Sequence, residues 1–216
     1  MLGDLFNNPV GFVMWVIALV VAITIHEFSH AFLADRLGDP TPRLQGRLTL
    51  NPLAHLDPLG SLLMLIARFG WGKPVMFDPF NLRNPRRDAA IISIAGPVSN
   101  LLLAGILSII LRVTLATPYA MLIVAILEPL IVLNVVLGVF NLVPIHPLDG
   151  FKIVGGILPA EYARQWYELE PYGMIFLIFM IFPFFGGTAP ISHFITPIIN
   201  FFLVIFLPGV GGSGII

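Results

Sequence analysis

The sequence predicts an all-α membrane protein. Hydrophobic residues make up 57% of its 216 residues and charged residues only 11%, which is too little charge to cover a water-soluble fold of this size. The apolar residues also gather in runs long enough to cross a bilayer. We expect one intramembrane domain over residues 1–216, because this length leaves no room for a second globular unit.

Composition also limits the partners and the chemistry. The formal net charge is −1, with 11 basic and 12 acidic residues, so no basic surface for a nucleic acid is expected. We expect neither a nucleic-acid partner nor a nucleotide cofactor, and the lipid bilayer is the expected surrounding. The chain contains no cysteine, so any metal ion must be held by His, Asp or Glu.

Five apolar runs are predicted as transmembrane helices. The first would extend for about 42 Å at 1.5 Å per residue, enough to cross the hydrocarbon and emerge. The fourth is the shortest, and we expect it to tilt or to pack against protein. The runs cover residues 10–37, 88–115, 119–143, 171–185 and 191–207.

The stretch between the first two runs is predicted to lie in the cytoplasm. Arg36–Arg87 holds eight of the eleven basic residues, and the positive-inside rule places such stretches on the cytoplasmic side. Within it, Leu59–Phe69 is apolar but too short to cross, which favours a re-entrant or interfacial segment. Polar and apolar side chains alternate over Arg47–Leu50, which predicts a short β-strand.

A metal site is predicted in the first run, where His26, Glu27 and His30 form a His-Glu-x-x-His motif. Residues four apart share one face of a helix, so both imidazoles can bind one zinc ion while Glu27 takes a proton from water. With five His and five Glu in the chain, roughly 0.003 such motifs are expected by chance. Ionisable side chains inside a span are costly, so these three residues need a partner such as a divalent cation.

A catalytic zinc site takes three protein ligands, so one more side chain must come from elsewhere in the chain. Asp149 directly follows the third run and is expected at the same membrane level as the end of the first helix. It is therefore the predicted third ligand. His146, three residues away, and His55, in the cytoplasmic stretch, remain alternatives as ligands or as groups that support them.

Two motifs, His26–His30 in the first run and Asn141–Gly150 at the end of the third, resemble those of the site-2 protease family of intramembrane zinc metalloproteases. The resemblance covers roughly residues 10–160, the predicted metal-binding core, with residues 171–207 as C-terminal helices. Three further segments resemble the short bacterial branch of that family, which carries no PDZ or CBS module: Gly46–His55, Asn81–Asp88 and Ala95–Asn100.

The resemblance implies that His26, His30 and Asp149 bind zinc and that Glu27 is the general base. It further implies an endopeptidase that hydrolyses a transmembrane protein substrate near the cytoplasmic face of a bacterial plasma membrane. A metal-binding transporter or a non-catalytic scaffold is the alternative, since both also place polar residues in spans. A transporter, however, distributes polar groups from one face to the other, whereas here they gather at the inner end.

Four residues are predicted to contact the substrate. Asn100 and Asn141 are amides in apolar helices that could stabilise an oxyanion, although such amides also link helices by hydrogen bonds. Leu48 and Leu50 lie on the predicted strand, whose edge could pair with an unwound substrate segment. An interfacial hairpin that only covers the site is the alternative for this segment.

Overall fold

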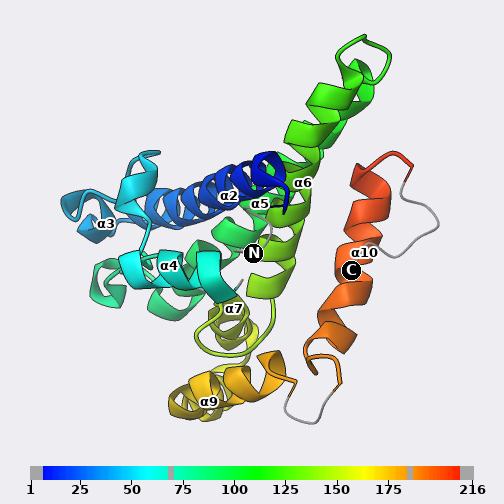
Figure 1. Cartoon of the computed structure of the whole chain (residues 1–216). Coiled ribbons are helices and arrows are strands. Elements are labelled where there is room, and N and C mark those ends of the chain that lie inside the picture. The colour runs from blue at the N-terminus through cyan, green and yellow to red at the C-terminus, as the bar shows by residue number, and fades with distance from the viewer. Residues whose placement is uncertain (1–6, 68–70, 184–186, 210–216) are drawn as a thin grey trace.

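The computed structural model describes residues 7–67, 71–183 and 187–209, and the regular structure in these ranges is helical, as predicted. Figure 1 shows how the helices are arranged. In chain order, the elements are α2 (Pro9–Arg36), α3 (Thr41–Leu44), η1 (Pro52–Ala54), α4 (Pro58–Ala67), η2 (Pro79–Asn81), α5 (Pro85–Thr114), α6 (Ala120–Asn141), α7 (Asp149–Ile157), α8 (Ala160–Tyr167), α9 (Glu170–Ile181) and α10 (Ser192–Phe206).

The first two long helices begin at local sequence signals. α2 starts at Pro9, and the side chain of Asn8 accepts a hydrogen bond from the Gly11 N–H at 3.0 Å. α5 likewise starts at Pro85. Proline suits the first turn because it has no N–H group to satisfy and its fixed φ is already helical.

Three helices, α2, α5 and α6, are long and apolar enough to cross a membrane, so the chain is an integral membrane protein. Of the five predicted crossings, these three are found in the part of the chain that the structure describes. α9 has 12 residues and α10 has 15, about 18 Å and 22 Å of helix against roughly 30 Å of hydrocarbon. Proline shortens both: Pro183 follows the C-cap of α9, and Pro190 precedes the start of α10.

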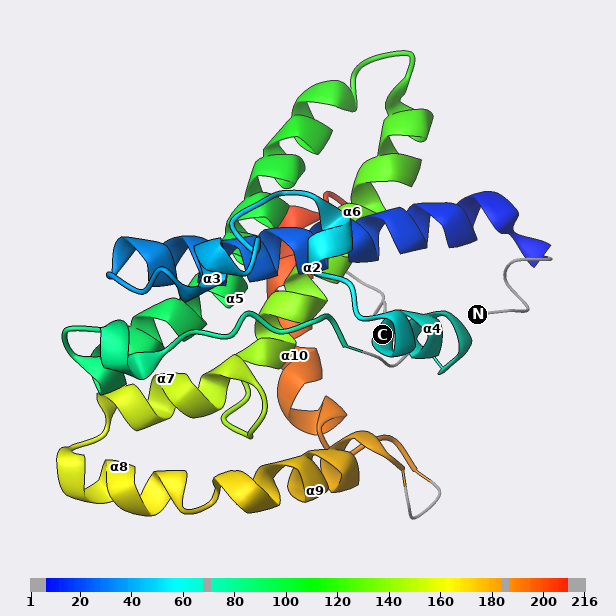
Figure 2. The same ribbon diagram turned by 90° about the vertical axis from the view of Figure 1, so that its left-hand side faces the viewer.

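The three long helices pack on one another through small residues. α5 and α6 form a hairpin, and α2 crosses this pair instead of running beside it (Figure 2). The buried face of α2 carries four fully buried alanines, which allow the backbones to approach closely. They are Ala18, Ala22, Ala31 and Ala34.

The later helices build outward from the α5–α6 hairpin. α10 packs on both of its helices through the buried side chains of Leu111, Val135 and Leu203. α7 turns back along α5, and α8 and α9 continue beyond it (Figure 2). The return of α7 brings its first residue, Asp149, toward the middle of the molecule, next to α2.

The stretch between α2 and α5 is held by side chains, and the predicted strand at Arg47–Leu50 is wrong. The Arg47 side chain is 5% exposed and donates hydrogen bonds to the carbonyl oxygens of Ala54 and Lys73. These carbonyls therefore bond to a guanidinium instead of a neighbouring strand. The chain then turns at once, because the side chain of Asn51 caps η1.

The short apolar segment predicted at Leu59–Phe69 forms α4, which ends at Ala67, and residues 68–70 lie outside the described ranges. At about 15 Å, α4 is too short to cross a bilayer alone, as its length in the sequence indicated. An extended segment, residues 71–78, then leads back toward α5. The Lys73 N–H donates to the His55 carbonyl at 2.8 Å, which pins this segment beside η1.

Asp39 fastens the end of this segment to the end of α2. Its carboxylate is fully buried and accepts hydrogen bonds from the backbone N–H groups of Thr41 and Asp78 at 3.0 and 2.7 Å, and from the Asn81 amide at 2.8 Å. Burial by itself raises the pKa of Asp39, but these hydrogen bonds hold that pKa below its ordinary value. The ionised carboxylate therefore stabilises the fold.

We predict that Asp39→Ala lowers the free energy of unfolding by about 3 kcal/mol, because buried donors lose their partner. A lowered pKa gives stability that is complete above the unfolded value of 3.8 and lost as pH falls through the folded value. The difference between wild type and variant should thus be constant near neutral pH and shrink below about pH 4.

Thermal unfolding in detergent, followed by tryptophan fluorescence, measures this difference. Asp35→Ala is the matched control, because the partner of Asp35 is the exposed Arg43, and such pairs contribute less than about 1 kcal/mol. Equal losses for the two variants at pH 7 would contradict the role given to Asp39.

Candidate metal centre

α2 carries the His-Glu-x-x-His motif on a face that is covered by α5 and α7. His26 is 5% exposed and His30 7%, and their ring centroids lie 4.6 Å apart. The four-residue spacing puts both imidazoles on one side of the helix, as predicted from the sequence. Glu27 lies between them and is half-buried.

Asp149 reaches these imidazoles from the first turn of α7. Its Oδ2 atom lies 3.0 Å from Nε2 of His26 and 3.2 Å from Nε2 of His30. The next residue, Gly150, makes this position possible, because a Cβ atom there would collide with the carbonyl oxygens of Leu142 and Val143. The absent side chain lets α7 fold back tightly on the end of α6.

Hydrogen bonds on the far side of each ring decide which nitrogen faces Asp149. Nδ1 of His26 lies 2.7 Å from Oδ1 of Asn100, and Nδ1 of His30 lies 2.7 Å from the Ile92 carbonyl oxygen. Both partners are oxygen acceptors, so each Nδ1 carries the hydrogen. Both Nε2 atoms then hold free lone pairs, which is the arrangement that metal-binding histidines use.

Asn100 is itself oriented by two acceptors. Its amide nitrogen donates to the Ala22 carbonyl at 3.0 Å and to Oδ1 of Asn134 at 2.8 Å, and the amide of Asn134 donates in turn to the Leu130 carbonyl. The side chains of Asn100 and Asn134 are fully buried. Each side chain in this network therefore donates to the next, from His26 to Asn100 to Asn134, and Oδ1 of Asn100 accepts the hydrogen of His26 Nδ1.

The converging atoms fit a divalent cation. Both Nε2 atoms and a carboxylate oxygen, all acceptors, lie within 4.8 Å of one another, and Oδ2 of Asp149 is buried without a hydrogen-bond donor. Ligand atoms of a tetrahedral zinc ion lie roughly 3.3 Å apart, close to the spacings observed here.

Gly96 of α5 forms the wall that faces these atoms. A Cβ atom at this position would lie 2.5 Å from Nε2 of His30 and 2.7 Å from Nε2 of His26. Even a methyl group would therefore occupy the space between the ligands. The glycine leaves that space open for an ion.

Glu27 contacts the extended segment that passes over the site. The Val75 N–H donates a hydrogen bond to its Oε2 atom at 3.0 Å, and Gly72 lies near its Oε1 atom. This contact joins residues 71–78 to the metal centre. Sequence analysis did not anticipate it, because no local pattern in residues 71–78 marks a partner of α2.

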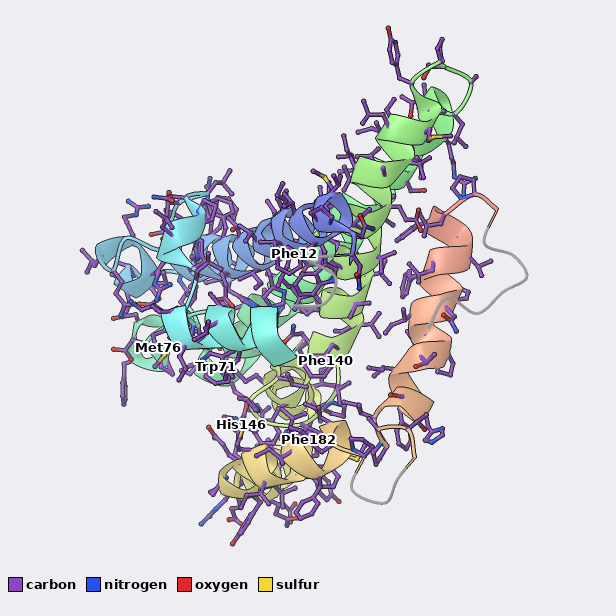
Figure 3. The ribbon with its side chains drawn as sticks, viewed as in Figure 1. Phe12, Trp71, Met76, Phe140, His146 and Phe182 are labelled. Atoms are coloured by element: carbon purple, nitrogen blue, oxygen red, sulfur yellow. The ribbon has the colours of Figure 1, made fainter. Side chains whose placement is uncertain are left out.

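The other predicted candidates lie apart from this cluster. His55 is fully buried, with Nε2 2.8 Å from the Thr49 carbonyl, and His146 lies beside α9, with Nδ1 3.6 Å from Glu170 (Figure 3). Neither belongs to the metal-binding group found among the described residues. Of the three candidates for the third ligand, only Asp149 lies beside His26 and His30.

The residues predicted to bind substrate are placed as follows. The two amide hydrogens of Asn100 are both engaged within the protein, which leaves neither for a substrate oxygen in this arrangement. The Asn141 amide donates to the Leu137 carbonyl at 3.0 Å at the end of α6. Leu48 and Leu50 stay predicted contacts, but without the strand on which that prediction rested.

Sequence analysis missed Asn134, although a signal was present. Asn134 and Asn141 are seven residues apart in an otherwise apolar run, and this spacing places both on one face of a helix. That face is the one turned toward α5 at Asn134, which bonds to Asn100. Two asparagines at helical spacing in an apolar run thus indicated the helix face on which Asn134 forms its buried hydrogen bond with Asn100.

Comparison with known proteins decides the family. The protein-family model described as Peptidase family M50 matches residues 113–184, a range that includes Asp149. YwhC of Bacillus subtilis, named as a zinc metalloprotease, is 42% identical over 177 residues, which are 78% of this chain and 80% of YwhC. The chain belongs to peptidase family M50, the site-2 protease family.

Two further relatives of the M50 chain carry zinc metalloprotease names. Rip2 of Mycobacterium tuberculosis is 33% identical over 173 residues, which are 77% of this chain and 66% of Rip2. MJ0392 of Methanocaldococcus jannaschii is 25% identical over 161 residues, 74% of this chain and 38% of MJ0392. No solved structure matches the chain. The family model and these relatives identify this M50 chain as a zinc metalloprotease.

We predict that Asn100→Ala weakens zinc binding by roughly 10- to 100-fold, because His26 loses the acceptor that orients its ring. Zinc affinity is measured by competition with a chelator in detergent. Thr24→Val is the control, since Thr24 is a buried polar residue of α2 whose hydroxyl donates to the Val20 carbonyl of its own helix. An affinity unchanged in Asn100→Ala would refute the orienting role.

We also predict that Gly96→Ala reduces the zinc content of the purified protein to a small fraction, because the added Cβ lies between the two imidazoles. Gly105→Ala in the same helix is the control. Its Cβ would make only ordinary contacts of 3.7 and 3.8 Å with the Phe206 ring, so zinc content should stay at the wild-type level. Metal analysis by mass spectrometry separates the two outcomes.

Proposed function

We propose that this M50 protein is an intramembrane endopeptidase that hydrolyses a peptide bond of a transmembrane protein substrate near the cytoplasmic face. The observation that carries the proposal is the convergence of His26 and His30, in the membrane-spanning helix α2, with Asp149 of α7, beside Glu27. We assign the three converging residues as zinc ligands and Glu27 as the general base. Zinc supplies Lewis acidity, which makes water acidic enough to lose a proton near neutral pH.

The contacts of Glu27 support the proposed role in proton transfer. As general base it accepts a proton from the attacking water and later delivers it to the departing amine nitrogen. The Val75 N–H donates to one carboxylate oxygen, Oε2, and holds the side chain in position. The other oxygen, Oε1, accepts no hydrogen bond within the described part of the chain, so it is the one we assign to water.

The proposed membrane side follows from charge. Arg36 ends α2 about ten residues beyond His26, and most basic residues lie between it and Arg87. By the positive-inside rule this end of α2 faces the cytoplasm, which puts the metal centre roughly 15 Å from that surface or less. A bacterial plasma membrane is the proposed location. Asn141, Leu48 and Leu50 remain proposed substrate contacts.

The proposal predicts that Glu27→Gln keeps zinc and loses cleavage by at least about 100-fold, because the amide cannot accept the proton. The zinc content and the cleavage products of the wild type and the variant in native membranes test this. Glu128→Gln, at an exposed glutamate of α6, is the control and should cleave normally. The zinc-loaded variant should also retain uncleaved membrane proteins, and identifying these proteins names the substrate.

A wild type that binds zinc but yields no cleavage product in its native membrane would contradict the proposed endopeptidase. Full cleavage by zinc-loaded Glu27→Gln would contradict only the assignment of Glu27 as the general base and would leave the endopeptidase proposal intact. Measuring the metal content of the same samples shows that a loss of cleavage is not caused by a loss of zinc.

A further inference from the structure

A cavity near the metal centre has no role in the chemistry described so far. It encloses about 310 Å³ between the extended segment, the start of α5, and helices α7 and α8. Val75, Phe77 and Ala89 contribute apolar walls. Three polar side chains also line it: Arg86, Lys152 and Tyr167.

The two cations of this cavity lack acidic partners. Arg86 and Lys152 are half-buried, and no carboxylate oxygen in the described part of the chain lies within 4 Å of either. The ammonium group of Lys152 lies 4.7 Å from the centre of the Phe77 ring, a cation–π contact that holds it at the cavity wall. Partly desolvated cations without counter-charges favour an anionic ligand.

Tyr167 adds a hydrogen-bond donor. Its hydroxyl group lies over Gly155 of α7, where a Cβ atom would approach it to 2.5 Å. Burial and the negative charge of Glu170 raise the pKa of this phenol despite the nearby positive charge of Arg86, so the hydroxyl keeps its proton at neutral pH. The cavity therefore offers two positive charges and one neutral donor.

The cavity shares its walls with the metal centre. Val75, whose N–H donates to Glu27, is one wall. Lys152 stands one helical turn after Asp149, and Ala89 one turn before Ile92, whose carbonyl oxygen orients His30. Counted along α5 from Gly96, the cavity begins roughly 10 Å from the metal-binding atoms. An extended peptide covers this distance in about three residues.

From this juxtaposition we propose that the cavity is a specificity pocket for an acidic substrate side chain, about three residues from the cleaved bond. The proposal rests on the proposed peptidase function and extends it to substrate choice. The methylene stem of Asp or Glu packs on Val75 and Ala89. Its carboxylate pairs with Lys152 and Arg86 and accepts a hydrogen bond from Tyr167.

The position of the pocket favours a peptide over a lipid phosphate as the occupant. A phosphate would satisfy the same charges, but the pocket is walled by the segment that holds Glu27 and by the helix that supplies Asp149. A ligand seated there is therefore within reach of a peptide bound at the metal centre, about three residues from its cleaved bond.

The test uses the purified, zinc-loaded full chain and a defined set of synthetic peptides with Glu, Gln, Ala or Lys at each position near one cleavable bond. Wild type should cleave the Glu peptide roughly tenfold faster than the Gln peptide at a single position. Lys152→Gln should abolish this preference, and Lys152→Glu should transfer it to the Lys peptide. Arg87→Glu is the control, because Arg87 is exposed and is not among the residues that line the cavity, and it should keep the wild-type preference.

Three results would overturn the proposal. Equal cleavage of all peptides by wild type would reject the pocket and leave the peptidase intact, whereas no cleavage of any peptide would reject both. The third is a lipid effect, in which Lys152→Glu slows the cleavage of all peptides equally in vesicles that contain phosphatidylglycerol but not in vesicles of pure phosphatidylcholine. In that case the ratio of the cleavage rates of the Glu and Gln peptides would stay unchanged. That result would assign the cavity to a lipid phosphate.

Discussion

Three lone pairs directed at one point, inside an apolar helix bundle, are the constraint on which the rest of this structure depends. The Nε2 atoms of His26 and His30 and the carboxylate of Asp149 repel one another unless a cation lies among them. Water cannot screen this repulsion at a buried site. The ion that relieves it therefore also links α2 to α7, and metal binding is coupled to the packing of the helices.

The surrounding helices are built to bring these groups together. Gly150 lets α7 turn back on α6, and Gly96 keeps the wall of α5 away from the ligands. The chain of amides from Asn134 through Asn100 to His26 turns a lone pair toward the site without placing a charge in the membrane. Small residues and neutral amides are compatible with a bilayer, because neither carries the cost of a buried ion.

The stretch between α2 and α5 shows where a prediction from the sequence pattern was wrong. Alternation over Arg47–Leu50 indicated a strand, but alternation records only that side chains differ in polarity. Arg47 is buried and donates hydrogen bonds to the carbonyl oxygens of Ala54 and Lys73, so its conformation depends on where those two residues lie. The segment that does extend, residues 71–78, is held by Glu27 and Asp39, which lie more than 35 positions earlier in the chain.

The sequence by itself determined the helical membrane character of the protein and the metal-binding spacing in α2, which follow from composition and the 3.6-residue period, both of them local. It ranked Asp149 first among three candidates for the third ligand, and only the packing of α7 against α2 brought Asp149, and not His146 or His55, beside the two imidazoles. Tertiary structure decided which nitrogen of each imidazole faces the metal, which backbone group holds Glu27, and where a cationic pocket forms. Those outcomes depend on pairs of groups such as Asn100 with His26 and Val75 with Glu27. Only the packing of distant segments sets such distances, and no local pattern records it.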